Sequence, residues 1–164
     1  MIKKIEPGSF SMLTSLETLD LSDNSLREVP ADVFHLPNLR KLYLADNDIG
    51  NDGFLTILKP VRAPLEYLNI ANTEIELIPD FGILPYLSHL NLSHNHLESI
   101  SPEQFAPFCQ ITFVDLNETG VGDCECHKSN FFIEKELKRD PLLSCGTLPP
   151  GKIDYINLIN LNHG

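Results

Sequence analysis

The sequence has no long apolar run and few basic residues, and none of its four cysteines comes before residue 109. A transmembrane helix needs about 20 mainly apolar residues in succession, and no such stretch is present. We therefore predict no direct membrane insertion of this segment. The N-terminal residues Met1–Pro7 also lack the apolar region of a secretory signal peptide.

Positive charge is scarce. There are 12 Lys and Arg against 23 Asp and Glu, giving a formal net charge of -11. Such a chain repels phosphate backbones and anionic membrane surfaces, so we exclude nucleic acid as a partner. Two readings of the charge stay open: it serves solubility alone, or it helps to select a basic partner.

Catalytic and metal-binding motifs are missing as well. The sequence has no nucleophile motif, no phosphate-binding loop and no set of ligands at metal spacing. Cys124, Cys126 and His127 lie close together, but the one-residue gap between the cysteines is shorter than the roughly two to four residues usual in zinc sites. We predict a protein that is not an enzyme and that holds neither cofactor nor metal.

The chain contains five copies of one leucine-based sequence frame. Leu16-x-x-Leu19-x-Leu21-x-x-Asn24-x-Leu26 is the first copy, and the others start at Leu39, Leu65, Leu87 and Ile111. In each copy the fourth and sixth positions are apolar and the fifth is mostly polar, which predicts a short half-buried strand. A repeat of this period is typical of a solenoid, in which each coil buries its apolar residues against its neighbours.

The frame resembles the leucine-rich repeat family over roughly residues 2 to 121. The resemblance implies an α/β solenoid with a parallel β-sheet on its concave face and an irregular or short-helical convex side. The ninth position is Asn in three copies, and its amide can bond the backbone of its own turn and of the next. Thr73 and Thr119 replace it in the other two, which predicts weaker turns. We divide the chain into repeats at 1–121, about five with the first incomplete, and a C-terminal cysteine-containing cap at 122–164.

The convex side also repeats. Matching offsets predict a spine of phenylalanines at Phe10, Phe34, Phe81 and Phe105. The segment 47–60 differs, because an Asn- and Asp-rich start, apolar residues at helical spacing and a final proline predict one or two helical turns. A second short helix is expected at 131–139, capped by a polar residue before it.

The cysteines cluster at the C-terminal end. Cys124, Cys126 and Cys145 resemble part of the C-terminal cysteine cap of extracellular leucine-rich repeat proteins, although the pattern's fourth cysteine is missing after Cys145. The resemblance implies a Cys124–Cys145 disulfide and an oxidising compartment. Cys126 then pairs with Cys109, pairs with a cysteine beyond this sequence, or stays free, and all three readings remain open.

Two glycosylation acceptors, Asn91-Leu92-Ser93 and Asn117-Glu118-Thr119, favour a secreted or cell-surface location. A glycan at Asn91 would cover part of the strand face. Because the first coil begins in mid-repeat at Ile2, we expect the chain to be a piece of a longer protein.

The outward-facing strand residues are the candidate binding surface. Aromatics with polar tips are favoured interface anchors, and an apolar centre with a charged rim suits a protein partner. The alternative is that these are ordinary exposed strand residues. The predicted partner-binding residues are an aromatic patch that crosses the repeats obliquely and the carboxylates beside it: Tyr43, Tyr67, His89, Phe113, Asp20, Asp46 and Asp115.

The function favoured by these patterns is an extracellular recognition module that binds a protein ligand or co-receptor. The resemblance extends to receptor ectodomains and to secreted immune or adhesion proteins, including the insect immune type, which implies innate immunity or cell-surface recognition. One alternative is a structural fragment that assembles, for instance as a dimer through the cap or the tail at 153–161. The other is an intracellular scaffold with reduced cysteines. The histidines at 89, 94 and 96 are read either as a pH switch or as solvated turn residues.

Overall fold

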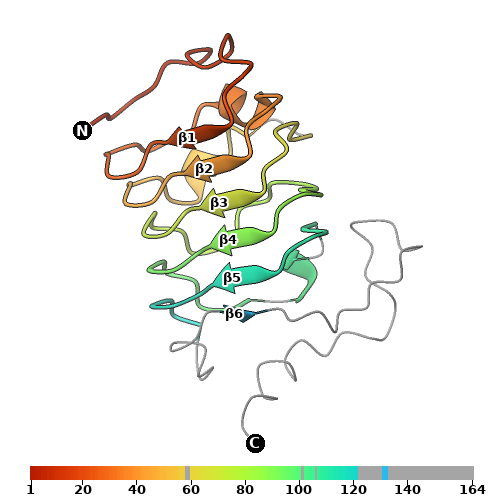
Figure 1. Cartoon of the computed structure of the whole chain (residues 1–164). Helices are drawn as coiled ribbons and strands as arrows, with labels where there is room; N and C mark the ends of the chain where they lie inside the picture. Colours follow the sequence, from red (N-terminus) through yellow and green to blue (C-terminus); the bar gives the residue numbers. More distant parts are fainter. Residues whose placement is uncertain (58–59, 101, 106, 122–130, 133–164) are drawn as a thin grey trace, which may run out of the picture.

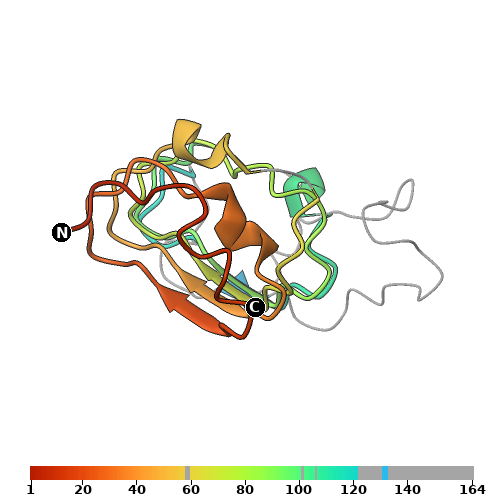
Figure 2. The same cartoon turned by 90° about the horizontal axis from the view of Figure 1, so that it is seen from above.

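The computed structural model describes residues 1–57, 60–100, 102–105, 107–121 and 131–132, and these form a stack of coils with one sheet along its length (Figure 1). Each coil contributes one three-residue strand. Viewed along the stack, the coils overlie one another, with the strands on one side and the helical turns away from them (Figure 2). The sheet has the order β1 to β6: β1 (Thr18–Asp20), β2 (Lys41–Tyr43), β3 (Tyr67–Asn69), β4 (His89–Asn91), β5 (Phe113–Asp115) and β6 (Phe131–Phe132).

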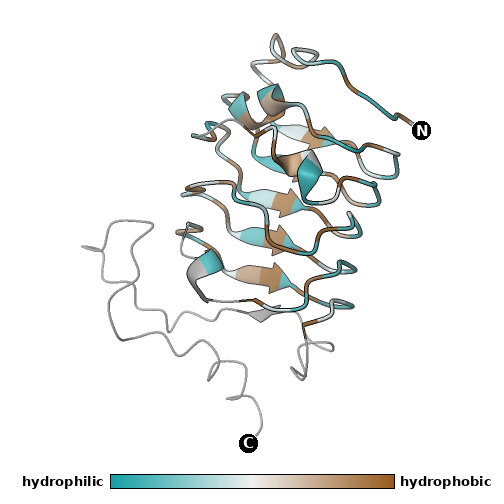
Figure 3. Cartoon of the chain, turned by 180° about the vertical axis from the view of Figure 1, so that it is seen from behind, coloured by the Kyte–Doolittle hydropathy of each residue, from teal (hydrophilic) through white to brown (hydrophobic). Residues whose placement is uncertain are grey.

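The strands β1 to β5 are parallel, and their register follows the leucine frame. The middle residue of each strand is aligned with the middle residue of the next and is buried. The residues on either side of it point the opposite way, as the two-residue period of a strand requires. In β1 to β4 the apolar middle residue is flanked by more hydrophilic residues, whereas β5 begins with two apolar residues, Phe113 and Val114 (Figure 3). The α/β solenoid with a parallel sheet, predicted from the repeat, is confirmed.

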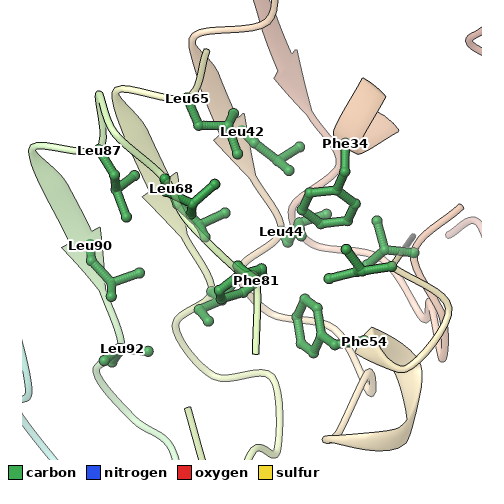
Figure 4. Close-up of a cluster of buried hydrophobic side chains, with 14 of the residues drawn as sticks. Phe34, Leu42, Leu44, Phe54, Leu65, Leu68, Phe81, Leu87, Leu90 and Leu92 are labelled. Atoms are coloured by element: carbon green, nitrogen blue, oxygen red, sulfur yellow. The ribbon is translucent and has the colours of Figure 1, made fainter. Parts of the chain in front are cut away.

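The core is a column of leucines continued by phenylalanines from the convex side (Figure 4). Phe34 and Phe81 are fully buried with ring centroids 6.1 Å apart. Phe54 meets the same Phe81 ring edge-on at 5.8 Å. Phe105 instead contacts Phe108, at 6.2 Å. Of the predicted spine, only the contact between Phe34 and Phe81 is found in the described residues. Phe54, which the repeat spacing did not identify, joins this pair.

Short 3-10 helices form the regular structure of the convex side: η1 (Ala31–His35), η2 (Asp52–Phe54) and η3 (Pro102–Phe105). The helical segment predicted at 47–60 is one such turn. It continues through hydrogen bonds from Leu55 N to Asp52 O and from Ile57 N to Phe54 O, both three residues apart. In the described residues, no helix is long and apolar enough to span a membrane.

An asparagine ladder joins the coils at the end of each strand. Asn47 Nδ2 donates to Leu44 O at 2.9 Å within its own coil and to Leu21 O at 3.0 Å in the coil before it. Asn95 repeats this pattern with Leu92 O and Ile70 O. At the threonine positions a single hydroxyl bonds the strand carbonyl of its own coil, at 2.8 Å in both cases. Thr73 and Thr119 thus make fewer side-chain hydrogen bonds than Asn47 and Asn95 do, and the weaker turns predicted from this stay a prediction.

The strand β6 corrects one sequence prediction. Phe131 and Phe132 were expected to open a helix, but they pair antiparallel with Val114 and Phe113 of β5. Without β6 the outer edge of β5 would have unpaired backbone groups, and phenylalanine favours strands, so pairing at this edge is preferred over the local helix signals. The remainder of the predicted helix and the tail at 153–161 lie outside the described residues.

Candidate functional site

Four aromatic side chains from four successive strands form one continuous stack on the outward face of the sheet. The ring centroids of Tyr43 and Tyr67 are 5.0 Å apart, those of Tyr67 and His89 are 6.0 Å apart, and those of His89 and Phe113 are 5.7 Å apart. We call these four residues the aromatic stack. The aromatic patch predicted from the sequence consists of the same four residues, and each neighbouring pair in it is in contact.

The path of the stack is straighter than predicted. Tyr67, His89 and Phe113 occupy the same register position on β3, β4 and β5. Tyr43 alone is displaced, because it aligns with Asn69, two residues after Tyr67. The stack is therefore a straight column of three rings with one lateral step at its N-terminal end.

The planes of neighbouring rings in the aromatic stack meet at moderate angles, between 25° and 36°. Tyr67 and His89 form a stacked pair at 25°, whereas the Tyr43–Tyr67 and His89–Phe113 pairs are tilted, at 36° and 34°. The ring edges and the polar tips then form the accessible surface.

The environment of Tyr67 supports this packing. Partial burial is the main cause that raises the pKa of its phenol above the ordinary value of 10.0. The neighbouring Tyr43 and the carboxylate of Asp115 raise it further. Both neighbours disfavour a phenolate, so Tyr67 remains a neutral hydrogen-bonding group at physiological pH.

Asp20 and Asp115, predicted as partner-binding residues, have a structural task as well. Oδ1 of Asp20 accepts a hydrogen bond from Ser22 N at 2.9 Å, and Oδ1 of Asp115 accepts one from Asn117 N at 3.0 Å. The asparagines at 69 and 91 make the same bond in the same register position, at 3.1 and 2.9 Å. These residues cap the strand ends as Asx turns.

The sequence patterns considered above did not identify this capping role, although the recurrence of Asp or Asn at the fifth position of four repeats signals it. Tyr43 is the exception in that column and carries a ring instead of a cap. A partner can still contact the capping aspartates through their Oδ2 atoms.

Asp46 lies in a turn that every coil repeats. It has a positive φ of 57°, and the equivalent residues of the other four coils have values between 49° and 55°. Left-handed backbone is costly for residues other than glycine, and among these Asn and Asp tolerate it best. Oδ1 of Asp46 also accepts a hydrogen bond from Asn72 Nδ2 at 2.8 Å. Asp46 is exposed beside the sheet, at the rim where the prediction placed it.

The three histidines have separate surroundings. His89 belongs to the aromatic stack, and its Nδ1 lies 2.8 Å from the hydroxyl of Ser88. His96 Nε2 lies 2.8 Å from Glu74 in the preceding coil. His94 occupies the left-handed turn position. No group of three potential metal ligands occurs among the described residues.

The glycosylation acceptors differ in their settings. Asn91 is half-buried beside the aromatic stack, and its Oδ1 caps its own strand end. Asn117 lies beyond the end of β5, two residues after Asp115. Of the cysteines, Cys109 is disulfide-bonded. Cys124, Cys126 and Cys145 lie outside the described residues, so the predicted pairing stays a prediction.

Comparison with known proteins agrees with this architecture. The family described as leucine rich repeat matches residues 1–49 and 63–120. Tsukushi of Mus musculus is 29% identical over 143 residues, covering 71% of this chain and 40% of the relative. Toll-like receptor 2 type-1 of Gallus gallus is 33% identical over 158 residues, covering 71% and 20%.

Similarity also extends to a protein of another kind. Leucine-rich repeat serine/threonine-protein kinase 1 of Caenorhabditis elegans is 37% identical over 90 residues, covering 54% of this chain and 4% of the relative. The chain thus spans two fifths or less of the length of these three relatives.

Proposed function

We propose that this chain, which belongs to the leucine-rich repeat family, is a recognition module that binds another protein through the concave face of its sheet. Domains of this family are generally protein-binding modules rather than enzymes. The observation that carries the proposal is the aromatic stack, which crosses four coils on the face where each strand presents its outward residues.

The geometry of the stack favours a protein over a sugar as the ligand. Sugars and quaternary ammonium groups bind to open ring faces. In the aromatic stack each inner ring has a ring neighbour on both sides, which leaves less of its faces open to a ligand. The ring edges and the Tyr hydroxyls suit a protein surface that is partly apolar and partly polar. Tyr67 is the central residue of the aromatic stack and would be the main anchor for such a partner.

The setting we propose is extracellular, as part of a secreted protein or a cell-surface ectodomain, in innate immunity or cell-surface recognition. Similarity to a Toll-like receptor and the late cysteines support it. We propose that the repeats of 1–121 supply the binding face and that 122–164 close the last coil. If the chain works in a reducing compartment instead, thiol titration of the unfolded natural protein without reductant will find all four cysteines free.

The two acceptor asparagines have different consequences for binding. A glycan on Asn91 would stand beside His89 and obstruct the aromatic stack. We therefore propose that Asn117 carries a glycan in the binding-competent protein and that Asn91 does not. Mass spectrometry of glycopeptides from the secreted protein tests this, and full occupancy of Asn91 in partner-bound protein would contradict it.

The binding proposal is tested with a pair of variants. Tyr67→Ala removes the central ring, and we expect it to weaken binding of the natural partner about tenfold or more, as for an interface hot spot. Leu77→Ala is the control, because Leu77 is 59% exposed and lies outside the strands. Partner protein isolated by crosslinking to the secreted chain would be titrated against both by surface plasmon resonance. Equal affinities for wild type and Tyr67→Ala would refute the concave-face proposal.

A further inference from the structure

One end of the aromatic stack differs from the rest in what lies beyond it. Tyr43 is the first ring, and its ring neighbour is Tyr67 on β3. On its other side lies β1, where the residue directly across from Tyr43 is Asp20. Adjacent strands are about 4.8 Å apart, so the outer face of the Tyr43 ring and the Asp20 carboxylate border the same space.

Negative charge collects around this end of the stack. Asp20, Asp23 and Asp46 are all exposed. Within the described part of the chain none of these three forms an ion pair. The outward positions of β1 to β5 and of the turns that follow them hold five carboxylates and a single lysine, Lys41.

Within the described residues, Asp20 and Asp46 each keep one carboxylate oxygen that accepts no hydrogen bond. Asp20 uses Oδ1 for the backbone of Ser22, and Asp46 uses Oδ1 for Asn72. Oδ2 of Asp20 makes no hydrogen bond within the described residues. An aromatic face beside an unpaired carboxylate matches one side chain in particular. The arginine guanidinium is planar, stacks on aromatic rings and presents paired N–H donors to a carboxylate.

We propose that the protein partner docks an arginine at the N-terminal end of the aromatic stack, with its guanidinium against the Tyr43 ring and its N–H groups directed at Asp20. This inference rests on the proposed concave-face function and deepens it by naming the chemistry of the partner. The excess of carboxylates on the same surface attracts a basic segment as a whole, and Tyr43 with Asp20 selects where its arginine lies.

The test uses a blocked tetra-arginine peptide as the probe and nuclear magnetic resonance titration of the labelled chain as the measurement. We expect the largest shift changes at Tyr43 and at the amides of Asp20 and Ser22. Asp20→Asn removes the charge but keeps an Oδ1 that caps the strand, as Asn69 and Asn91 already do in the same column. We expect it to weaken probe binding about fivefold, the scale of one surface ion pair.

Asp115→Asn is the matched comparison. It removes the same charge from the same column and keeps the same backbone bond, at the other end of the sheet. We expect it to weaken probe binding about twofold or less, through net charge alone. Tyr43→Leu, which keeps an apolar side chain without a ring face, is expected to weaken binding about threefold.

Equal losses for Asp20→Asn and Asp115→Asn would show that the probe responds only to net charge, and would overturn the proposal. Tetra-lysine that binds the same residues as tightly as tetra-arginine would overturn it as well, because an ammonium lacks the planar fork. If Tyr67→Ala abolishes binding of the natural partner but the probe shows no localised arginine site, the proposed concave-face function is supported and only the arginine inference is contradicted. If the probe binds at a localised arginine site but Tyr67→Ala does not change the affinity for the natural partner, the proposed concave-face function is contradicted instead.

Discussion

The outward residues of the strands divide into those that hold the sheet together and those that are left to recognise something. Asp20, Asn69, Asn91 and Asp115 cap strand ends, so their presence is explained by the fold. Tyr43 stands in the same column without that duty. Because the fold does not require a ring at this capping position, Tyr43 is stronger evidence for a binding role than the capping residues are.

Tyr67 gives a test of the stack that needs no ligand. Its raised pKa means that the unfolded chain loses the phenol proton first as the pH rises. The stabilising contribution of the neutral phenol is therefore complete below pH 10 and is lost as the pH rises through the folded-state pKa. We expect the free energy of unfolding of wild type to fall more steeply above pH 10 than that of Tyr67→Phe.

The measurement is urea unfolding from neutral to alkaline pH, together with a titration of the Tyr67 ring resonances. Asp115→Asn is expected to lower the pKa of Tyr67 while leaving it above the ordinary value, because burial is the larger cause. A Tyr67 that titrates like a free tyrosine in the wild-type protein would mean that the ring does not pack as described.

At the scale of elements, the sequence predicts the structure best for residues whose role depends only on their own repeat. Period-2 alternation inside each repeat predicts the buried leucines and the positions of the five parallel strands. The aromatic contacts then follow when those strands are aligned in register. What it missed depends on contacts between coils. Phe54 reaches Phe81 of another coil, and β6 forms because β5 has a free edge. Neither relation is visible in a local pattern.

The helical turn η2 depends on a glycine for its close approach to the preceding coil. A Cβ built on Gly53 would lie 2.4 Å from Arg27 O and 2.4 Å from Ile49 Cγ2. The backbone of Gly53 also accepts a hydrogen bond from Val29 N at 3.2 Å. Gly53→Ala therefore has to push η2 away from that coil, and we expect a loss of about 1–3 kcal/mol in the free energy of unfolding.

Gly50 supplies the control for this substitution. Its φ is +59°, and the nearest atom to an added Cβ is Glu74 O at 4.0 Å. Because asparagine tolerates left-handed backbone, Gly50→Asn should cost less than Gly53→Ala in the same urea titration. A loss for Gly50→Asn as large as that for Gly53→Ala would mean that backbone conformation, rather than close packing, requires the glycines of this segment.

At the scale of the whole molecule, stability is transmitted from coil to coil, because a solenoid has no single centre. Loss of the hydrogen bonds between two neighbouring coils is therefore expected to uncouple those coils. Asn95 is the strongest such link around the middle of the sheet. Its Nδ2 donates to Ile70 O at 2.8 Å in the preceding coil, and its Oδ1 accepts from Thr73 N at 3.0 Å and Ile75 N at 3.2 Å.

The asparagine at 95 matters more because its neighbour in the ladder is a threonine. Thr73 bonds Ile70 O with its hydroxyl and offers no amide of its own. The junction between the third and fourth coils thus relies on Asn95 alone for bonds from a ladder amide. Asn95→Ala would leave buried backbone groups of both coils without partners, and we expect it to cost about 2–4 kcal/mol.

Asn51 is the matched control for this last prediction, since it joins coils through a similar set of bonds in an exposed position. Its Nδ2 donates to Leu77 O at 2.8 Å, and its Oδ1 accepts from Glu76 N at 2.8 Å and Leu77 N at 3.2 Å. Water replaces these partners when the side chain is removed, so Asn51→Ala should cost about 1 kcal/mol or less. Hydrogen exchange after Asn95→Ala should accelerate first at the amides of Thr73 and Ile75, where the lost acceptor was. Equal costs for the two substitutions would show that burial does not decide the strength of the ladder.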